Sequence, residues 1–278
     1  KKQTPKTVLV DAGNSISGTF YPPIFRIFGH EVETLFCDLD GNFPNHQPDP
    51  ERPENLVACR EKVLDMGADF GFVYDGDGDR VGIILEDGTV LSADKILYVL
   101  AADFLSRNAG AKIVLDIMSS QTVLGKIKAL GGEPILAKTG HSYIEEAMHK
   151  HGALFGGEQS GHFMFGENFY GHDDAMLASL RFLIAVEDQP QLLTEITENW
   201  SDLLEFSERL DVPDEQKFEA LENIKSALLE TLPKEQLNLL DGIRIDFNEE
   251  EWAIIRCSNT SPKMAVRIEA RDQQSLEA

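Results

Sequence analysis

The sequence predicts an α/β protein made of two related three-layer α/β/α domains with mixed sheets, followed by a small α+β domain. The first observation is an internal repeat, because an apolar strand that ends in an aspartate occurs at 8–11 and again at 113–116. Each strand leads through a polar turn into a segment with helical apolar spacing, which ends at Gly29 in the first unit and at Gly131 in the second. The second observation is that this alternation stops after about residue 205. Alternating strands and helices are typical of a sheet covered by helices, and their loss indicates a different, smaller domain.

The remaining elements follow from hydrophobic periodicity, and they divide the chain into predicted domains at 1–91, 92–204 and 205–278. In the first two domains we expect further strands and helices, with strands at 32–36, 67–74, 81–85, 134–136 and 152–156 and helices at 94–107 and 173–186. In the last domain we expect a helix at 215–232 and strands at 242–247, 252–256 and 264–270. A chain of 278 residues is larger than one hydrophobic core usually supports, in agreement with several domains.

The charge is strongly acidic, with 25 basic and 48 acidic residues and a net charge of −23. Such a surface repels nucleic-acid phosphates and anionic lipids, so we expect neither nucleic acid nor a membrane as a partner, and a bound anion needs a local basic pocket. The cysteines (Cys37, Cys59 and Cys257) lack metal-ligand spacing, which predicts reduced thiols in a cytoplasmic protein. The polar opening at 1–6 shows no signal-peptide pattern, and we interpret it as a linker exposed by a cut upstream.

Asp75, Asp77 and Asp79 alternate with glycines directly after an apolar strand. Three carboxylates at this spacing can converge on one hard cation, because the glycines permit unusual backbone angles. A calcium EF-hand is a competing interpretation, since Glu86 lies at the twelfth position of the loop. However, Arg80 stands where an EF-hand needs glycine, and the flanks are strand-like rather than helical. A solvated acidic turn is the other alternative, and the apolar flanks argue against it.

The Asp-Gly-Asp-Gly-Asp-Arg loop after a buried strand resembles the metal loop of the α-D-phosphohexomutases, which move phosphate between C1 and C6 of a hexose. The resemblance implies that Asp75, Asp77 and Asp79 bind Mg²⁺, with an oxygen of a phosphoserine as the fourth ligand. It also implies that Arg80 lies close to the transferred phosphoryl group as a catalytic residue. The implied substrate is a phosphohexose, and the implied intermediate is a hexose 1,6-bisphosphate.

A second polar loop, Gly-Glu-Gln-Ser-Gly-His at 157–162, occupies the same position in the second unit. It resembles the family's sugar loop, which implies that Glu158 and Ser160 bind adjacent ring hydroxyls. A carboxylate accepts two hydroxyl protons, and a serine hydroxyl both donates and accepts. The resemblance also assigns His162 to the substrate, although a structural hydrogen-bonding role remains the alternative.

The segment Lys-Thr-Gly-His at 138–141 resembles the family segment whose histidine lies over the active site. This implies a catalytic His141 that helps in proton transfer or phosphate binding, and a substrate-binding Lys138. Without the neighbouring motifs, a strand-end turn with a surface histidine would be the simpler interpretation.

The segment Arg-Cys-Ser-Asn-Thr-Ser-Pro at 256–262 follows a predicted strand and resembles the phosphate-binding loop of the family's last domain. A guanidinium, hydroxyls, an amide and free backbone N–H groups suit a phosphate dianion, and a plain hairpin turn is the alternative. The residues implied to bind phosphate are Arg256, Ser258, Asn259, Thr260 and Arg267. An anion bound to so acidic a protein needs a local basic pocket. These loops would supply it with the following residues: Arg80, Lys138, His141, His162, Arg256 and Arg267.

The resemblance covers essentially the whole chain, but only the second, third and fourth of the family's four domains. No Thr-x-Ser-His-Asn-Pro-type segment is present, so we expect the chain to be inactive alone and its partner to be the missing N-terminal domain of the same protein. Met118 stands where many relatives have a lysine, which leaves that substrate contact open. The expected parent is an intramolecular phosphotransferase of the phosphomannomutase/phosphoglucomutase type. Phosphoglucosamine mutase and a non-catalytic sugar-phosphate and metal-binding module are the alternatives.

Overall fold

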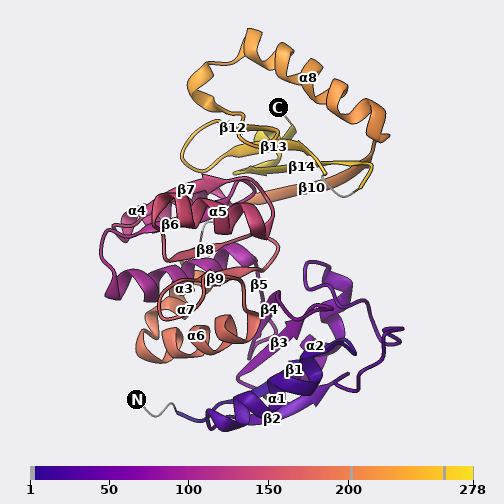
Figure 1. Ribbon diagram of the computed structural model, residues 1–278, viewed down its shortest axis with the longest axis vertical. Coiled ribbons are helices and arrows are strands. Elements are labelled where there is room, and N and C mark those ends of the chain that lie inside the picture. Colours follow the sequence, from indigo (N-terminus) through magenta and orange to yellow (C-terminus); the bar gives the residue numbers. More distant parts are fainter. Residues whose placement is uncertain (1–3, 201–202, 259–260, 278) are drawn as a thin grey trace.

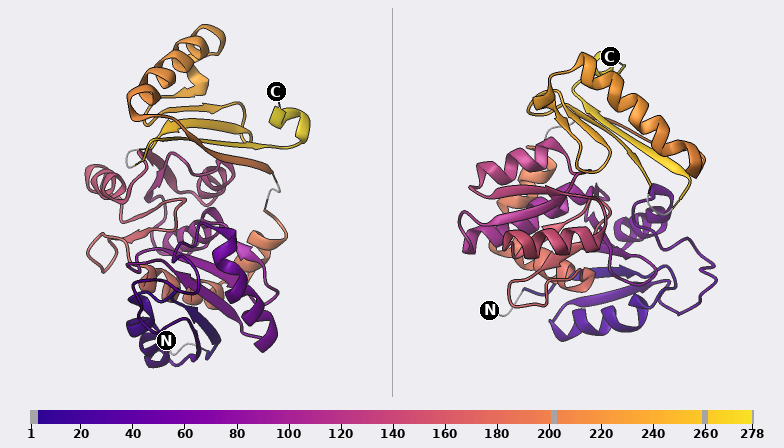
Figure 2. Two further views of the ribbon diagram at one scale, coloured as in Figure 1. Left: turned by 90° about the vertical axis from the view of Figure 1, so that its right-hand side faces the viewer. Right: turned by 45° about the horizontal axis from the view of Figure 1, so that its top comes forward.

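The computed structural model describes residues 4–200, 203–258 and 261–277, which form three sheets with their covering helices. Figures 1 and 2 show these units one above another along the long axis, in the order of the sequence. The first two units are α/β/α layers with mixed sheets and the third is an antiparallel sheet with helices, so the predicted fold class is confirmed. The domain boundaries stay a prediction.

The first sheet has the strand order β2-β1-β3-β4-β5, with β1 parallel to both neighbours and the later pairs antiparallel. Its strands are β1 (Thr7–Asp11), β2 (Glu31–Leu35), β3 (Phe70–Tyr74), β4 (Val81–Leu85) and β5 (Val90–Leu91), and its helices are α1 (Ser17–Ile27) and α2 (Pro53–Met66). Every residue of β3 and β4 is buried, as expected for continuous apolar runs in a central position. The helix α2 ends at Gly67, whose φ of 64° lies in the left-handed region that favours glycine.

The second sheet repeats this topology in the order β7-β6-β8-β9, again with two parallel pairs and an antiparallel hairpin. Its strands are β6 (Lys112–Asp116), β7 (Glu133–Ala137), β8 (Phe155–Gly157) and β9 (Phe163–Phe165). Its helices are α3 (Ala93–Arg107), α4 (Gln121–Ala129), α5 (His141–His151), α6 (Ala175–Asp188) and α7 (Gln191–Thr197). The β3–β4 and β8–β9 loops therefore occupy equivalent places in related sheets.

The third sheet is antiparallel, in the order β10-β14-β13-β12-β11. Its strands are β10 (Leu204–Asp211), β11 (Leu237–Asn238), β12 (Ile243–Asp246), β13 (Trp252–Cys257) and β14 (Lys263–Ala270), and its helices are α8 (Asp214–Thr231) and α9 (Gln273–Glu277). In Figure 1, α8 lies on the side of this sheet that faces away from the second unit.

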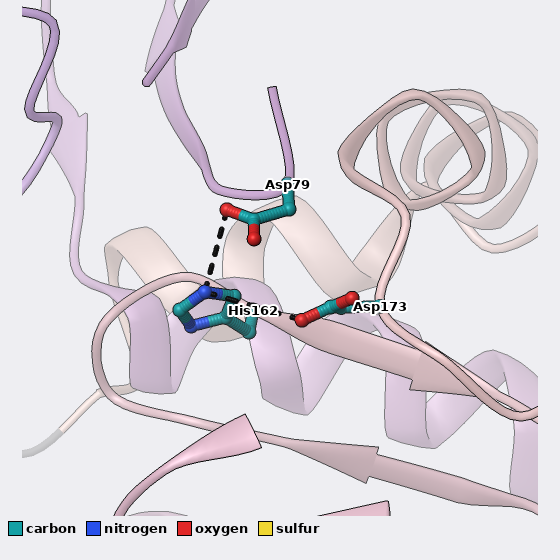
Figure 3. A group of neighbouring side chains, drawn as sticks. All are labelled: Asp79, His162 and Asp173. Atoms are coloured by element: carbon teal, nitrogen blue, oxygen red, sulfur yellow. Dashed lines mark ion pairs between the residues drawn. The ribbon is translucent and has the colours of Figure 1, made fainter. Parts of the chain in front are cut away.

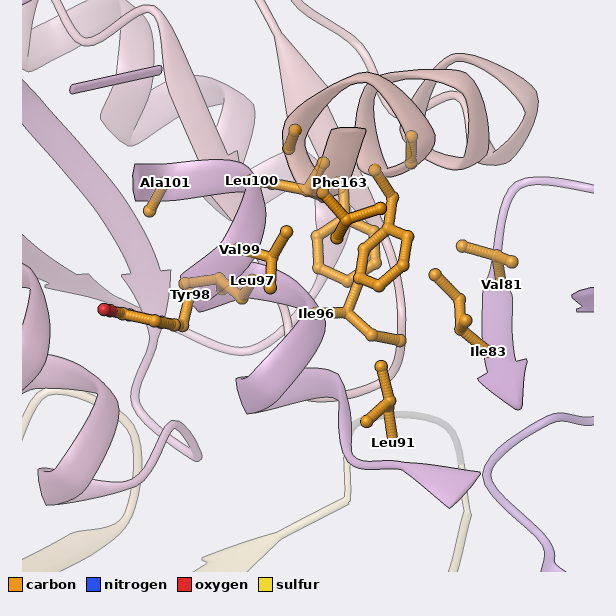
Figure 4. Close-up of a cluster of buried hydrophobic side chains, with 14 of the residues drawn as sticks. Val81, Ile83, Leu91, Ile96, Leu97, Tyr98, Val99, Leu100, Ala101 and Phe163 are labelled. Atoms are coloured by element: carbon orange, nitrogen blue, oxygen red, sulfur yellow. The ribbon is translucent and has the colours of Figure 1, made fainter. Parts of the chain in front are cut away.

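The first two units share one hydrophobic core, because β3, β4 and β5 pack against α3 and α6. Figure 4 shows Val81, Ile83 and Leu91 facing Ile96 and Phe163 across this junction. Burial of large apolar side chains on both sides makes the junction as well packed as a domain interior. The β3–β4 loop and the β8–β9 loop are thus placed relative to each other by a common core.

The third unit contacts the second through Trp252 and Ile254, which pack against Ile117. Arg244 is fully buried there, and its Nη1 donates hydrogen bonds to the carbonyl oxygens of Ile117 and Ser119, each at 2.6 Å. This interface fixes the last sheet against the segment that follows β6.

Candidate active site

The β3–β4 loop gathers the three predicted metal ligands. Carboxylate oxygens of Asp75, Asp77 and Asp79 all lie within 4.8 Å of one another. The turn is held by Asp75, whose Oδ1 accepts hydrogen bonds from the backbone N–H groups of Gly78 and Arg80. Gly78 has a φ of 83°, and a Cβ there would lie 3.0 Å from the hydroxyl of Tyr21, so glycine suits both the backbone and the space. This set of hard oxygen donors is of the kind that Mg²⁺ prefers.

The carboxylates of this loop differ in their electrostatic surroundings. Burial raises the pKa of Asp75 to about 6, although Arg80 donates to its oxygens and opposes the rise. For Asp79, burial also favours the neutral acid, but the contact with the His162 imidazole outweighs it and lowers the pKa. The Oδ1 atom of Asp79 is buried and forms an ion pair with His162 Nε2 at 3.3 Å.

Arg80 is anchored by carboxylates on two segments. Its Nε lies 2.8 Å from Asp75 Oδ2, and its Nη1 lies 3.1 Å from Asp49 and 3.3 Å from Glu51. Asp49 and Glu51 lie between β2 and α2, in a region to which the sequence motifs gave no role. The guanidinium therefore sits at the edge of the metal loop, with its charge already shared among three acids.

Backbone contacts join the β3–β4 loop, which was predicted to bind metal, to the β8–β9 loop, which was predicted to bind sugar. Arg80 and His162 form an isolated antiparallel β-bridge, and the N–H of Val81 donates to the carbonyl of Gly161 at 3.3 Å. Gly161 has a φ of 97°, and a Cβ there would meet the Val81 carbonyl at 3.2 Å, so this approach depends on glycine. The structure thus brings two loops more than 70 residues apart in sequence into direct contact.

The predicted sugar ligands lie in the β8–β9 loop, where Glu158 is buried and Ser160 is half-buried. Glu158 accepts a hydrogen bond from the N–H of Gly140 through Oε1, and its Oε2 lies 3.0 Å from His162 Nδ1. The Ser160 hydroxyl lies 2.8 Å from the same Nδ1. The carboxylate, hydroxyl and imidazole therefore form one connected group.

His162 lies between the two loops, as Figure 3 shows for its contacts with Asp79 and Asp173. Its Nε2 is 3.3 Å from Asp79 Oδ1. Burial alone would lower the pKa of this histidine, but the contacts and charges of Asp79 and Glu158 raise it to about 10. The side chain is accordingly an imidazolium at neutral pH, and it supplies positive charge to the site.

The predicted Lys-Thr-Gly-His segment lies beside this group. His141 begins α5, is exposed, and stacks on His162 with ring centroids 5.9 Å apart. Lys138 is exposed, and its Nζ lies 5.6 Å from the centroid of the Tyr143 ring. The structure therefore brings His141, His162 and Glu158 close to one another, whereas the Lys138 side chain is exposed.

Arg256 reaches the same segment through an acid that the sequence motifs did not identify. Its Nε and Nη2 each lie 3.1 Å from Asp241 Oδ2, and this oxygen also accepts a hydrogen bond from the N–H of Thr139. Ser258 follows β13, and its carbonyl accepts a hydrogen bond from Lys217 Nζ at 2.7 Å. Asn259 and Thr260, the other predicted phosphate ligands of this loop, lie outside the described residues.

Arg267 is the predicted ligand that the structure separates from the others. Its guanidinium is buried between the second and third units, where Nη2 lies 2.7 Å from Glu269 and 3.5 Å from Asp94. Its Nη1 donates to the carbonyl of Met118 at 2.7 Å. In this arrangement Arg267 contributes to the interface, so the expected basic pocket assembles only in part. Met118 also lies at this interface, where its carbonyl oxygen accepts the hydrogen bond from Arg267.

The sequence motifs assigned no role to three aspartates that hold parts of the site in place, namely Asp116, Asp173 and Asp241. Asp116, at the end of β6, accepts hydrogen bonds from Ser119 Oγ and from the N–H of Gln159, and so holds the sugar loop. Burial, followed by the negative charge of Glu158, raises the pKa of Asp116 to about 7. Asp173 lies beside both histidines, and Asp241 joins Arg256 to Thr139. Only Asp116 had a local signal, since it ends a strand of the internal repeat.

Among the residues that the structure describes, no helix has the length and apolar character that crossing a membrane requires.

Comparison with known proteins finds similarity over almost the whole chain. Residues 1–88, 92–203 and 208–278 match the family profiles described as phosphoglucomutase/phosphomannomutase alpha/beta/alpha domain II, alpha/beta/alpha domain III and C-terminal domain. The chain is 38% identical to a phosphomannomutase/phosphoglucomutase of Pseudomonas aeruginosa, covering 98% of this chain and 58% of the relative. It is 37% identical to a phosphoglucomutase of Neisseria gonorrhoeae, covering 100% and 60%.

Among solved structures, a phosphoglucomutase/phosphomannomutase family protein from Burkholderia thailandensis superposes with a TM-score of 0.85 at 33% identity, over 100% of this chain and 59% of that one. The chain thus spans about three fifths of the length of the relatives it matches. With three domain profiles matched in order, the chain belongs to the phosphoglucomutase/phosphomannomutase family.

Proposed function

We propose that the protein containing this chain is a phosphohexomutase of the phosphomannomutase/phosphoglucomutase type. The reaction is a reversible transfer of phosphate between C1 and C6 of a hexose, through a phosphoserine and a hexose 1,6-bisphosphate. The sequence holds no Thr-x-Ser-His-Asn-Pro-type segment, so in this scheme the phosphoserine comes from outside these 278 residues. Relatives named for this activity, similar over almost the whole chain, support the proposal.

The observation that carries the proposal is the contact between the metal loop and the sugar loop. The Arg80–His162 bridge sets a group of oxygen ligands next to a buried carboxylate and a hydroxyl, which are the groups that recognise a polyol. A phosphoryl group held at the first loop would therefore lie beside a sugar held at the second. Positioning of this kind, together with electrostatic stabilisation, is the main contribution that a protein makes to phosphoryl transfer.

Asp75, Asp77 and Asp79 would hold Mg²⁺, and the convergence of their carboxylate oxygens fits such an ion. When bound, Mg²⁺ supplies positive charge that offsets the charge on the phosphoryl oxygens. The protein's own residues hold the remaining charges: Arg80 would face the phosphoryl group, and the His162 imidazolium orients Glu158. His141 is the exposed imidazole available for proton transfer.

The remaining roles concern the substrate. We assign Glu158 and Ser160 to adjacent ring hydroxyls and His162 to their positioning. The non-transferring phosphate is assigned to the following residues: Lys138, Arg256, Ser258, Asn259, Thr260 and Arg267. For Arg267 this role requires that the guanidinium leave Glu269 and Asp94, which makes it the weakest member of the set. The free thiols of Cys37, Cys59 and Cys257 support a reducing compartment, and we propose the cytoplasm.

The direct test compares turnover of mannose 1-phosphate, glucose 1-phosphate and glucosamine 1-phosphate by the full-length protein with Mg²⁺ and the bisphosphate activator. Turnover of the first two is the expected result. Activity on glucosamine 1-phosphate alone would replace the proposal with a phosphoglucosamine mutase. The 278-residue chain by itself should bind glucose 6-phosphate without turning it over, as a non-catalytic module would, and measurable turnover by the chain contradicts that expectation.

A matched pair of variants tests the metal loop. Asp77→Asn removes an exposed ligand from the β3–β4 turn, whereas Asp87→Asn changes an exposed aspartate in the turn at the other end of β4. Mg²⁺ binding, measured by calorimetry on the 278-residue chain, should weaken by about tenfold or more for Asp77→Asn and stay unchanged for Asp87→Asn. Equal affinities in the two variants would place the ion elsewhere.

A further inference from the structure

A second group of ligand atoms lies beside the site just described and contains nitrogen as well as oxygen. One atom each of His141, Glu145 and Asp173 lies within 4.8 Å of the others. His141 and Glu145 are four residues apart in α5, so they lie on one face of that helix. Asp173 comes from the loop before α6, where a β-bridge with Met164 fixes its backbone. Two separate, well-placed elements therefore bring the group together.

The Asp173 carboxylate has one oxygen that no described hydrogen bond uses. Its Oδ2 atom is buried, and it accepts no hydrogen bond from residues 4–200, 203–258 or 261–277. Two imidazole nitrogens face it, His141 Nδ1 at 3.7 Å and His162 Nε2 at 4.0 Å. Both distances exceed a hydrogen bond. The 3.7 Å between His141 Nδ1 and Asp173 Oδ2 matches two ligands of one metal ion, which lie about 3.4–4.1 Å apart when each metal–ligand bond is about 2.0–2.1 Å and the angle is tetrahedral or wider.

Of the two histidines, His141 is the one with a nitrogen to offer. Both ring nitrogens of His162 are engaged, Nε2 with Asp79 and Nδ1 with Glu158 and Ser160, and Figure 3 shows its ring held between Asp79 and Asp173. The exposed His141 ring has a partner only in Asp173 among the described ion pairs, and its side chain is 58% exposed. A cation there would reach solvent on its open side.

We propose that His141, Glu145 and Asp173 form a binding site for a borderline divalent cation such as Zn²⁺ or Co²⁺, separate from the aspartate loop. One imidazole and two carboxylates are a donor set that suits Zn²⁺, whereas the all-oxygen set of Asp75, Asp77 and Asp79 suits Mg²⁺. Three protein ligands leave a coordination position for water or for an oxygen of a ligand in the cleft. Occupancy takes the His141 nitrogen out of proton transfer, so the cation acts as an inhibitor of any reaction that needs this base.

The test uses binding rather than activity, so it is independent of the proposed reaction. The 278-residue chain is titrated with Co²⁺ in the presence of saturating Mg²⁺, and visible absorption reports on nitrogen ligation. We expect one Co²⁺ per chain, displaced by Zn²⁺ and insensitive to Mg²⁺. His141→Gln and Glu145→Gln should each weaken Co²⁺ binding by about tenfold or more. The matched control is His149→Gln, an exposed histidine near the end of the same helix, which should bind as the unmodified chain does.

Two further results decide between this site and its neighbours. Asp79→Asn should leave the Co²⁺ spectrum and affinity unchanged, because Asp79 belongs to the other ion. Loss of the spectrum in Asp79→Asn would assign the ion to Asp79, His162 and Asp173 instead. Complete displacement of Co²⁺ by Mg²⁺, or equal affinities in Glu145→Gln and His149→Gln, would overturn the proposal. Thermal melting by circular dichroism on each variant confirms that α5 remains folded.

Discussion

Replacing Arg244 with methionine should detach the last domain from the rest of the molecule. Arg244 is fully buried, donates to the carbonyl oxygens of Ile117 and Ser119, and lies 4.0 Å from the centroid of the Trp252 ring. Two charge-assisted hydrogen bonds contribute about 3 kcal/mol at the low end of their usual range, and stacking on a tryptophan adds about 1 kcal/mol. The buried Nη2 of Arg244 has no hydrogen-bond partner among the described residues, and this costs about 1 kcal/mol of the stabilisation.

The expected net loss is therefore about 3 kcal/mol, and it falls on the contact between the second and third units, because methionine leaves the carbonyl oxygens of Ile117 and Ser119 without these donors. For a domain of this size the loss corresponds to a melting temperature lower by roughly 10–20 °C. Differential scanning calorimetry should show a separate early transition, and limited proteolysis should degrade the C-terminal domain first.

The control is Arg271→Met, which removes an exposed ion pair with Glu250 at 2.7 Å. Exposed ion pairs contribute little to stability because solvent screens them, so this variant should melt like the unmodified chain. A single transition for Arg244→Met, with an unfolding free energy within about 1 kcal/mol of the control, would refute the reasoning. In that case the apolar contacts of Trp252 alone would hold the domain.

Two other predictions concern the supporting structure. The hydrogen bond to Asp11 raises the pKa of His46, although burial opposes the rise. The ion pair therefore contributes its whole stabilisation below the pKa of an unfolded histidine, about 6.5. That stabilisation is lost as the pH rises through the pKa of His46 in the folded protein. His46→Gln should cost about 1.5–3 kcal/mol near pH 5 and clearly less near pH 9 in chemical denaturation, and an equal cost at both would rule out the charged pair. Gly242 and Gly131 have φ angles of 82° and 81°, but a Cβ at Gly242 would meet the Ile255 carbonyl at 2.3 Å, whereas Gly131 has open space. Gly131→Ala should cost about 1 kcal/mol and Gly242→Ala about 1–3 kcal/mol more, and similar costs would mean that the chain at Gly242 relaxes freely.

The sequence predicted those parts of the site whose residues are close to one another in the chain. Asp75, Asp77 and Asp79 are close in sequence and follow a strand, so their convergence depends on one turn. The same holds for Glu158, Ser160 and His162. The equivalence of the two loops could be predicted because strand order follows from the repeat, and the ends of parallel strands meet at one edge of a sheet.

The parts that could not be predicted depend on packing between distant segments. Arg267 lies on a strand beside a phosphate-type loop, but the sequence does not reveal that Asp94, more than 170 residues earlier, covers that face. Asp173 has no neighbouring motif, and its role arises only because α5 begins next to it. Asp241 likewise gains its place from contacts with both Thr139 and Arg256.

The core shared by the first two units has a consequence for building variants of this protein. Apolar side chains of the first sheet, among them Val81 and Leu91, are covered by α3 and Phe163 of the second unit rather than by their own helices alone. Cutting the chain after Leu91 would expose this surface on both halves, and each half would tend to aggregate. Chimeras with other members of the family should therefore exchange the first two units as one block. The third unit, held by the smaller contact around Trp252 and Arg244, is the piece that can be exchanged by itself.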